Sequence, residues 1–200
     1  MNKQVFLDIL EEHGKLGFQE QIDYDKFCLY SIVTHSTAIE GSTMTEIDNQ
    51  LLFDEGISAK GKSIVEQNMN FDLKAAYERS MELARTHTPF SVGVLKHLSS
   101  LVMRMTGGVV NGMGGSFDSS RGDLRLVNVT AGAGGKTYLN YLKVPQRLAV
   151  FCREMNERRE QLLKQPDVYE QYKLSFDAHL NLVIIHPWVD GNGRMSRLVM

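Results

Sequence analysis

The sequence has little of what several protein classes require. Among 200 residues there are two cysteines, four prolines and one tryptophan, and the formal net charge is −2. The two cysteines, Cys28 and Cys152, allow one disulfide at most and lack the spacing of a zinc site, so we expect reduced, buried thiols. Because binding to nucleic acid or to an anionic membrane surface favours a basic face, this charge balance predicts neither partner.

Long apolar runs are also missing. The first ten residues, MNKQVFLDIL, contain a short apolar stretch that Asp8 interrupts, which does not fit a secretory signal. No later stretch is apolar over the roughly 20 residues that a membrane-spanning helix needs. The sequence therefore predicts a cytoplasmic globular protein, and its hydrophobic content of 42% is ordinary for such a domain.

Apolar residues recur at helical spacing over most of the chain, which predicts an all-α fold. Thr45 is placed to cap a helix that ends at Gly56, and Ser63 with Glu66 has the spacing of a capping box for the next helix. The expected helices cover residues 31–41, 46–55, 64–84, 90–105, 145–164 and 168–185.

Residues 107–135 have a different composition, rich in Gly, Ser and Asn around one strand-like run at residues 124–129. This composition predicts a long loop or a hairpin on the helical body. Residues 138–143, YLNYLK, alternate like a short edge strand. Loops of this length usually carry function.

One segment matches a phosphate-binding motif residue by residue, but the elements expected around it are not those that the motif requires. Residues 56–63, GISAKGKS, match the P-loop pattern G-x-x-x-x-G-K-[ST], which is meaningful only between a strand and a helix. The residues before Gly56 have the pattern of a capped helix, so Gly56 is better explained as the end of that helix and Ser63 as the cap of the next. A partial second match at residues 129–137 lacks its first glycine and predicts a hairpin tip.

The segment HPWVDGNGRMSR, residues 186–197, combines groups that fit one chemistry. A proline ends the preceding helix, and Gly191 and Gly193 allow a tight turn whose amide hydrogens point at a ligand at the start of a new helix. Such a turn binds anions. Arg194 and Arg197 are three residues apart on that helix, where two guanidinium groups can hold separate phosphates.

Two further side chains complete this interpretation. Asp190, directly before the turn, would repel phosphate oxygens unless a divalent cation lay between them, and Mg²⁺ typically takes one carboxylate together with substrate phosphates. His186 has an ordinary pKa of about 6.5 and can act as a general base toward an incoming hydroxyl. The alternative, a charged surface turn, leaves this combination of groups unexplained.

The same segment resembles the signature of the Fic (Fido) family, His-Pro-aromatic-x-Asp/Glu-Gly-Asn-Gly-Arg-x-x-Arg, and fills every defined position. The resemblance implies an all-α enzyme with a short β-hairpin flap that transfers AMP from ATP to a Ser, Thr or Tyr hydroxyl of a protein, with Mg²⁺ as cofactor. It assigns deprotonation of the hydroxyl to His186 and Mg²⁺ binding to Asp190. It assigns binding of the α- and β-phosphates to the backbone of Gly191, Asn192 and Gly193 and to Arg194.

The N-terminal region resembles that of Fic proteins that carry their own inhibitory helix, with the motif Ser/Thr-x-x-x-Glu-Gly/Asn. Ser36, Glu40 and Gly41 fit this motif. Independently of the family, the spacing of Ser36 and Glu40 puts both on one face of the helix expected over residues 31–41. The resemblance implies that Glu40 pairs with Arg197 and occupies the space that the γ-phosphate of ATP needs, so the protein is predicted to inhibit itself.

The resemblance also divides the chain. Residues 1–88 correspond to the N-terminal helical region and residues 89–200 to the Fic core, which stops at Met200, so we expect that core to be cut short. A flap that aligns the target peptide by adding it to a strand edge is assigned to one short segment. Its residues are Lys136, Thr137, Tyr138, Leu139 and Asn140.

Three alternatives stay open. The same scaffold serves for transfer of another phosphate-linked group or for removal of AMP from a modified protein, because both need the base and the anion-binding turn. A nucleotide-binding regulatory module with little turnover is the alternative outside the enzymes. The expected partners are ATP and a protein target with a hydroxyl side chain. Whether the protein also modifies itself and whether it forms a homodimer are left open.

Overall fold

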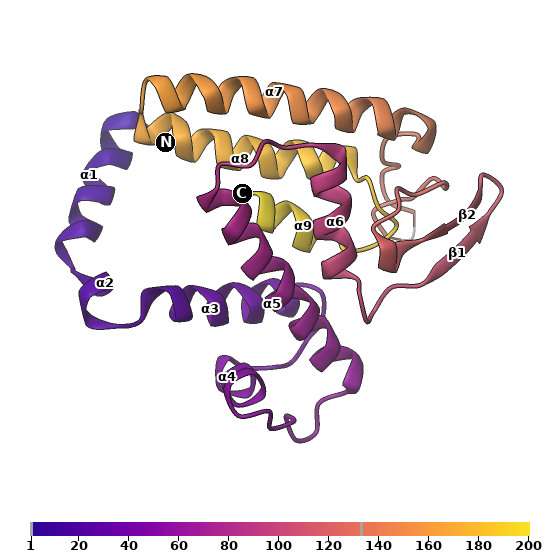
Figure 1. Ribbon diagram of the computed structural model, residues 1–200, viewed down its shortest axis with the longest axis horizontal. Helices are drawn as coiled ribbons and strands as arrows, with labels where there is room; N and C mark the ends of the chain where they lie inside the picture. Colours follow the sequence, from indigo (N-terminus) through magenta and orange to yellow (C-terminus); the bar gives the residue numbers. More distant parts are fainter. Residues whose placement is uncertain (1, 133) are drawn as a thin grey trace.

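The computed structural model describes residues 2–132 and 134–200. The N-terminal part consists of α1 Lys3–Lys15, α2 Phe18–Gln21, α3 Tyr24–Ala38, α4 Glu46–Asp54 and α5 Ile64–Arg85. The rest consists of α6 Val92–Val102, strands β1 Val109–Gly112 and β2 Gly115–Asp118, the 3₁₀ helices η1 Ser119–Arg121 and η2 Tyr141–Lys143, α7 Val144–Lys164, α8 Val168–Ile185 and α9 Asn192–Val199. The fold is all-α with a small antiparallel hairpin, as the sequence predicts (Figure 1).

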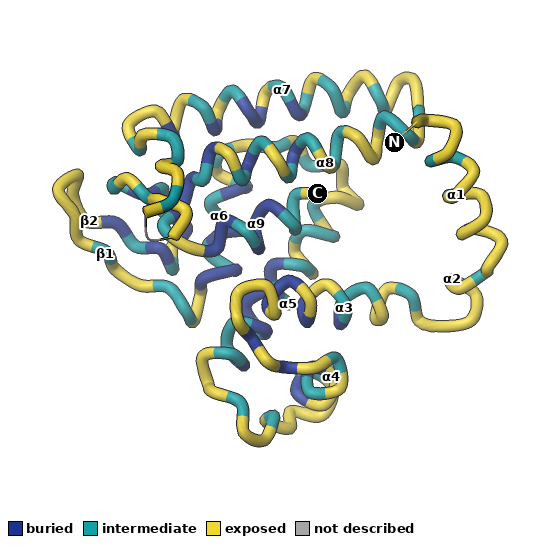
Figure 2. The backbone as a smooth tube through the Cα atoms, turned by 180° about the vertical axis from the view of Figure 1, so that it is seen from behind, coloured by how far each residue is buried: buried dark blue, intermediate teal, exposed yellow. Residues whose placement is uncertain are grey.

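Helix α9 lies at the centre of the molecule (Figure 1). It contacts α3, α5, α6 and α8, while α7 packs on the outer side of α8. Figure 2 shows that buried residues lie along α5 to α9 and in the second half of α3, whereas α1 and the connection after α4 are mostly exposed. Helices from both halves of the sequence therefore enclose the C-terminal helix. The apolar core around it includes Leu73, Leu95, Leu148, Leu182, Ile185, Trp188 and Met195.

Both predicted helix caps are confirmed. Thr45 and Asp48 form a reciprocal capping box at α4, and Ser63 and Glu66 form one at α5. Gly56, with φ +68°, follows the end of α4. Residues 56–63 therefore connect two helices, and the rejection of a P-loop there is confirmed.

Two helix predictions need correction at their ends. The helix expected over residues 31–41 begins earlier, at Tyr24, and ends at Ala38, so Glu40 lies in the turn that follows. Gly41 continues this turn with φ +97°, a conformation that favours glycine. The helix expected over residues 90–105 is shorter, because Ser91 caps it and Met103 already leaves the helical conformation.

Both strand predictions were wrong. Residues 124–129 form no strand, because Arg125 N donates to Pro187 O at 3.0 Å instead of pairing with a neighbouring strand. Residues 138–143 end in the 3₁₀ helix η2, which Asn140 caps through its side chain. The hairpin lies earlier in the Gly-rich segment, where Gly112 pairs with Gly115 beside a two-residue turn.

The hairpin tip predicted at residues 129–137 is present as a narrow connection. Thr130 and Thr137 form an isolated antiparallel bridge, and Tyr138 N donates to Val129 O at 3.1 Å. Ala133, inside this tip, lies outside the described residues. The segment thus returns on itself without forming a regular sheet.

Both cysteines are free thiols. Cys152 is buried as expected, and burial raises its pKa to about 11, which keeps it protonated at neutral pH. Cys28 is only half-buried. Of the helices in the described residues, none has both the length and the apolarity to cross a bilayer.

Candidate active site

The signature segment, residues 186–197, consists of a loop between α8 and α9, residues 186–191, and the first residues of α9. His186 follows the last residue of α8 with φ +51° and ψ +63°, a left-handed conformation that non-glycine residues rarely adopt. Gly191 has φ +76° and caps α9; a Cβ there would lie 2.9 Å from Met103 Sδ. These two left-handed residues set where the loop begins and ends.

The imidazole of His186 is half-buried, and its Nδ1 lies 3.3 Å from Val183 O. A neutral ring that donates from Nδ1 keeps its lone pair on Nε2, the form that a general base needs. Burial lowers the pKa of His186, and the positive charge of Arg125 lowers it as well. The bond to Val183 O and the charge of Asp190 oppose these effects without reversing them. The ring is therefore mostly neutral at pH 7.

Tyr138 covers one face of this imidazole. The ring centroids of Tyr138 and His186 are 3.7 Å apart and the planes differ by 16°. The lone pair of Nε2 lies in the imidazole plane, whereas the Tyr138 hydroxyl lies in the plane of the stacked ring. The Tyr138 hydroxyl therefore does not point at Nε2, and any group that gives a proton to Nε2 would have to approach along the edge of the imidazole.

Asp190 lies beside the anion-binding turn, which we define as residues 191–193. Its Oδ1 accepts a hydrogen bond from Gly191 N at 2.6 Å and lies 3.7 Å from Arg194 Nη2. The side chain is 64% exposed, and neither contact uses Oδ2. An open carboxylate oxygen fits Mg²⁺, which takes one carboxylate plus substrate phosphates. Since the described residues contain no cluster of three His, Cys, Asp or Glu side chains, a cation here would need substrate oxygens as ligands.

Arg194 is a buried cation with weak partners. Its side chain is 2% exposed, its Nη1 lies 3.4 Å from Val102 O, and its Nη2 lies 3.4 Å from Met103 Sδ. The contact to the carbonyl oxygen is long for a hydrogen bond, the thioether is a weak acceptor, and Nε has no partner among the described residues. Buried charges are normally paired and hydrogen-bonded. Its nearest carboxylate is Asp190, at 3.7 Å from Nη2, so the guanidinium keeps donor capacity that a phosphate could use.

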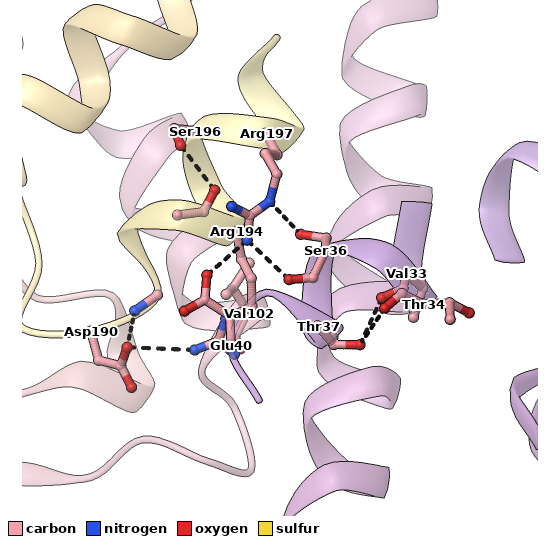
Figure 3. Close-up of polar contacts among 12 residues, drawn as sticks. Val33, Thr34, Ser36, Thr37, Glu40, Val102, Asp190, Arg194, Ser196 and Arg197 are labelled. Carbon is pink, nitrogen blue, oxygen red and sulfur yellow. Dashed lines mark hydrogen bonds and ion pairs between the residues drawn. The ribbon is translucent and has the colours of Figure 1, made fainter. Parts of the chain in front are cut away.

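Arg197 is held by the end of α3 (Figure 3). Its Nε donates to Ser36 Oγ at 2.7 Å, and its Nη2 donates to Ser36 O at 3.0 Å and to Glu40 Oε1 at 2.7 Å. The same Glu40 oxygen lies 2.5 Å from the place where a Cβ on Gly193 would be. The carboxylate of Glu40 thus lies against the anion-binding turn and is paired with Arg197.

A buried polar network holds the turn that carries Glu40. Asn70 of α5 accepts from Thr37 Oγ1 at 3.0 Å and from Asn49 Nδ2 at 3.0 Å, and its own amide donates to Ser42 Oγ at 3.2 Å. All four of these side chains are buried. Removing one partner from a buried polar group costs about 1–3 kcal/mol. The position of Glu40 therefore depends on more than its own ion pair.

The arrangement agrees with a comparison of sequences, in which residues 89–200 match the model of the Fic/DOC family. The chain belongs to this family. It is 30% identical over 177 residues to a protein named protein adenylyltransferase Fic from Drosophila persimilis; the match covers 88% of this chain and 31% of the relative. A protein of the same name from Nematostella vectensis is 26% identical over 178 residues, covering 88% of this chain and 37% of the relative.

A solved structure of similar fold is a Fic domain containing signaling protein from Bacteroides thetaiotaomicron. Its TM-score is 0.71 at 18% identity, with 88% of this chain and 62% of that chain covered. At this identity the likeness supports the Fic fold alone. This Fic-family chain spans about a third of the length of the curated relatives named above.

Within the Fic signature, the side chain of Asn192 bonds the backbone of the loop itself. Its Oδ1 accepts from Trp188 N at 3.0 Å and its Nδ2 donates to Trp188 O at 2.9 Å. Trp188 is buried and donates through its indole to Gly122 O at 3.2 Å. Only the backbone of Asn192 is therefore offered to a phosphate, which is the role that the family resemblance gives it.

The flap, residues 136–140, reaches the site through two of its five residues. Tyr138 stacks on His186, and Leu139 O accepts a hydrogen bond from Arg125. Lys136 and Thr137 are exposed near the hairpin tip, and Asn140 caps η2. The flap is not the regular edge strand that we expected.

Sequence reasoning missed two residues of the site, Arg125 and Met103. Arg125 stands in the run that we interpreted as a strand, where a lone arginine among apolar residues is the one signal that it folds inward. Met103 packs against Gly191 and Arg194 from the end of α6, and no sequence motif marks it.

Proposed function

We propose that this Fic-family chain is the catalytic part of a protein adenylyltransferase, which attaches AMP from ATP to a Ser, Thr or Tyr hydroxyl of a protein. The names of its relatives support this function. The observation that carries it is the anion-binding turn, residues 191–193, between a neutral imidazole and two arginines, with a carboxylate already against it. In this scheme residues 89–200 form the catalytic core and residues 1–88 restrain it.

The proposed reaction uses the free nitrogen of the base. A target hydroxyl approaches the edge of the imidazole and gives its proton to His186 Nε2. Its oxygen forms a bond to the α-phosphorus of ATP while the bond from that phosphorus to the oxygen bridging to the β-phosphate breaks, so AMP is attached and pyrophosphate leaves. The amides of residues 191–193 and the guanidinium of Arg194 bind the phosphates and stabilise the charge that develops. Mg²⁺ bound through Asp190 and the phosphates would neutralise part of that charge.

Glu40 restrains this reaction in the proposed scheme. Its carboxylate takes one guanidinium nitrogen of Arg197 and lies over Gly193, both of which a third phosphate would need. A negative charge there repels the γ-phosphate, so bound ATP lies with its α-phosphorus turned away from the target hydroxyl. Removal of the carboxylate frees the guanidinium and the space together.

The donor group can be identified with labelled nucleotide. We expect Glu40→Gly to attach label from ATP labelled on the α-phosphate and none from ATP labelled on the γ-phosphate. Glu40→Gly with His186→Ala, which keeps the anion-binding turn, should attach neither. Label from the γ-phosphate would instead show phosphoryl transfer, and reversible binding without covalent label would show a regulatory module.

Removal of AMP is the remaining alternative on this scaffold. A protein that carries labelled AMP should keep its label when incubated with Glu40→Gly and without pyrophosphate. Release of free AMP under these conditions, faster than with the His186→Ala variant, would show hydrolysis of the AMP bond by water and would favour AMP removal over the proposed transfer.

A further inference from the structure

Arg125 is a buried arginine whose partners are all backbone carbonyls. The residue is 1% exposed. Its Nε donates to His186 O at 2.7 Å, its Nη1 donates to Val127 O at 2.7 Å, and its Nη2 donates to Leu139 O. Its own backbone N–H donates to Pro187 O. The side chain of Arg125 thus connects three segments, which are the loop that begins at His186, the segment before the flap, and the flap itself.

Stability alone does not account for a cation in this place. Burial lowers the pKa of Arg125, which means that the charged form is disfavoured there. Replacing buried charges by apolar residues of similar volume is often neutral or stabilising in proteins. What the guanidinium supplies is geometry, because its planar fork can donate to three separate acceptors at once, whereas an ammonium acts as a point charge.

The backbone of His186 is the part of the site that most needs such support. It has a left-handed conformation at φ +51°, which is strained for a non-glycine residue. Arg125 bonds the carbonyl of this residue and, through its own backbone, the carbonyl of Pro187. On the other side it bonds the carbonyl of Leu139, whose neighbour Tyr138 stacks on the imidazole.

We propose that Arg125 is a positioning residue that couples the flap to His186, so that movement of the flap and orientation of the base occur together. The proposal deepens the proposed function and rests on it where His186 is treated as the base. A target peptide that docks on the flap would then act on the base through Arg125 as well as through direct contact.

The electrostatic surroundings of the imidazole allow a second readout. The charged groups that affect it are Arg125 and Asp190, and Tyr138 is the titratable side chain stacked on it. Arg125 disfavours the protonated imidazole, and Asp190 favours it. Loss of the Arg125 charge should therefore raise the pKa of His186, while a lysine that keeps the charge should leave it nearly unchanged.

The test compares Arg125→Lys with a matched control, Arg159→Lys, both in the Glu40→Gly background. Arg159 also donates to two backbone carbonyls, Thr88 O at 2.9 Å and His87 O at 3.0 Å, but these lie away from the signature segment. Hydrogen exchange followed by mass spectrometry needs no turnover. It reports on residues 126–140, a peptide that contains the flap and the segment before it, and on residues 183–190, a peptide that contains His186. Its result is therefore independent of the proposed reaction.

We expect Arg125→Lys to speed exchange in both peptides together and to lower kcat by about 10- to 100-fold, because misplacing a catalytic group by about 1 Å has effects of this size. Arg159→Lys should change neither peptide. Arg125→Met should in addition move the acid limb of the kcat profile to higher pH, which Arg125→Lys should not. Faster exchange in one peptide only, or the same changes in Arg159→Lys, would overturn the coupling.

A second variant covers the case in which Arg125 substitutions do not fold. Asn128 is exposed and accepts from Tyr141 N at 3.1 Å, which ties the segment before the flap to its far end. Asn128→Ala loosens the flap without touching Arg125 or His186. The coupling predicts faster exchange in residues 183–190 as well as in residues 126–140, and a change confined to the flap would contradict it.

Discussion

The end of α3 and the flap both contact the signature segment, but at different residues and through different chemistry. The end of α3 contacts Arg197 with a carboxylate, a hydroxyl and a carbonyl, and a buried polar network centred on Asn70 holds it. The flap contacts His186 with one stacked ring and is tied by backbone carbonyls. Contacts of the first kind depend on charge, and those of the second on shape.

In the proposed mechanism, this difference assigns a separate event to each segment. The carboxylate beside Arg197 would compete with a phosphate and so affect how the nucleotide binds. The ring stacked on His186 leaves the edge of the imidazole open and would affect how the target hydroxyl approaches. Substitutions on the two sides should therefore change different steps of the reaction.

The largest expected effect is that of His186→Ala, which separates nucleotide binding from transfer. We expect His186→Ala in the Glu40→Gly background to lower transfer by about 10²–10⁴-fold while ATP still binds, because a general base acts on the barrier rather than on ground-state affinity. Calorimetric titration with ATP and Mg²⁺, together with label transfer, measures both quantities. Transfer at a rate near that of Glu40→Gly alone would remove His186 from the mechanism.

Asp190→Asn should instead weaken the binding of ATP with Mg²⁺. A neutral amide is a poorer ligand for a hard cation among phosphates, so we expect affinity for ATP with Mg²⁺ to fall by about tenfold or more, which corresponds to about 1.4 kcal/mol. Titration with and without a chelator provides the comparison. If chelation of Mg²⁺ leaves binding and transfer of the parent unchanged, the metal role of Asp190 is wrong.

Ser36→Ala tests the α3 side without removing the carboxylate. The change deletes the hydroxyl that accepts from Arg197 Nε and keeps the bonds to Ser36 O and Glu40. A hydrogen bond of this kind contributes about 1 kcal/mol, so basal transfer should rise several-fold, less than in Glu40→Gly. Ser31→Ala, the same substitution in the same helix and away from Arg197, is the control. Equal rises in the two variants would mean that general loosening of α3 is responsible.

Tyr138→Ala tests the flap side and should have the smallest effect. Burial is the main cause that lowers the pKa of His186, so uncovering the ring should move that pKa back toward its ordinary value. Because the neutral ring is the active form, activity is lost as pH falls through this pKa, and the acid limb of the profile should shift to higher pH. Tyr138→Phe keeps the stacking and should not shift it. If the acid limb lies at the same pH in the parent, Tyr138→Ala and Tyr138→Phe, the flap does not shield His186 from solvent.

Local signals in the sequence were sufficient for much of the fold. The capping boxes at Thr45 and Ser63 involve residues three apart, and the apolar periodicity of α5, α7 and α8 is strong enough to place these helices within a few residues. The pairing of Glu40 with Arg197 followed from two matched family motifs, and the two residues are in contact. In each case the information lies in side-chain type at a short, fixed spacing.

The remaining parts depend on partners that no pattern reveals. Arg125 binds backbone carbonyls, which every residue has, so nothing in the sequence identifies Leu139 or His186 as its acceptors. The run at residues 124–129 alternates like a strand, but its backbone bonds a loop from the other end of the chain. The network around Asn70 joins three helices and is equally invisible before folding.

The central claim, that Glu40 restrains a competent site, is tested most directly by label transfer from α-labelled ATP to protein. Wild type, Glu40→Gly, and Glu40→Gly with His186→Ala are compared at equal concentration after their melting temperatures have been shown to agree. The account predicts low, high and no transfer in that order, with Glu40→Gly at least about tenfold above wild type, and Glu40→Gln between them because the amide loses the charge but still fills the space. A folded Glu40→Gly that transfers no more label than wild type would contradict it, and Glu40 would then be an ordinary carboxylate at the end of a helix.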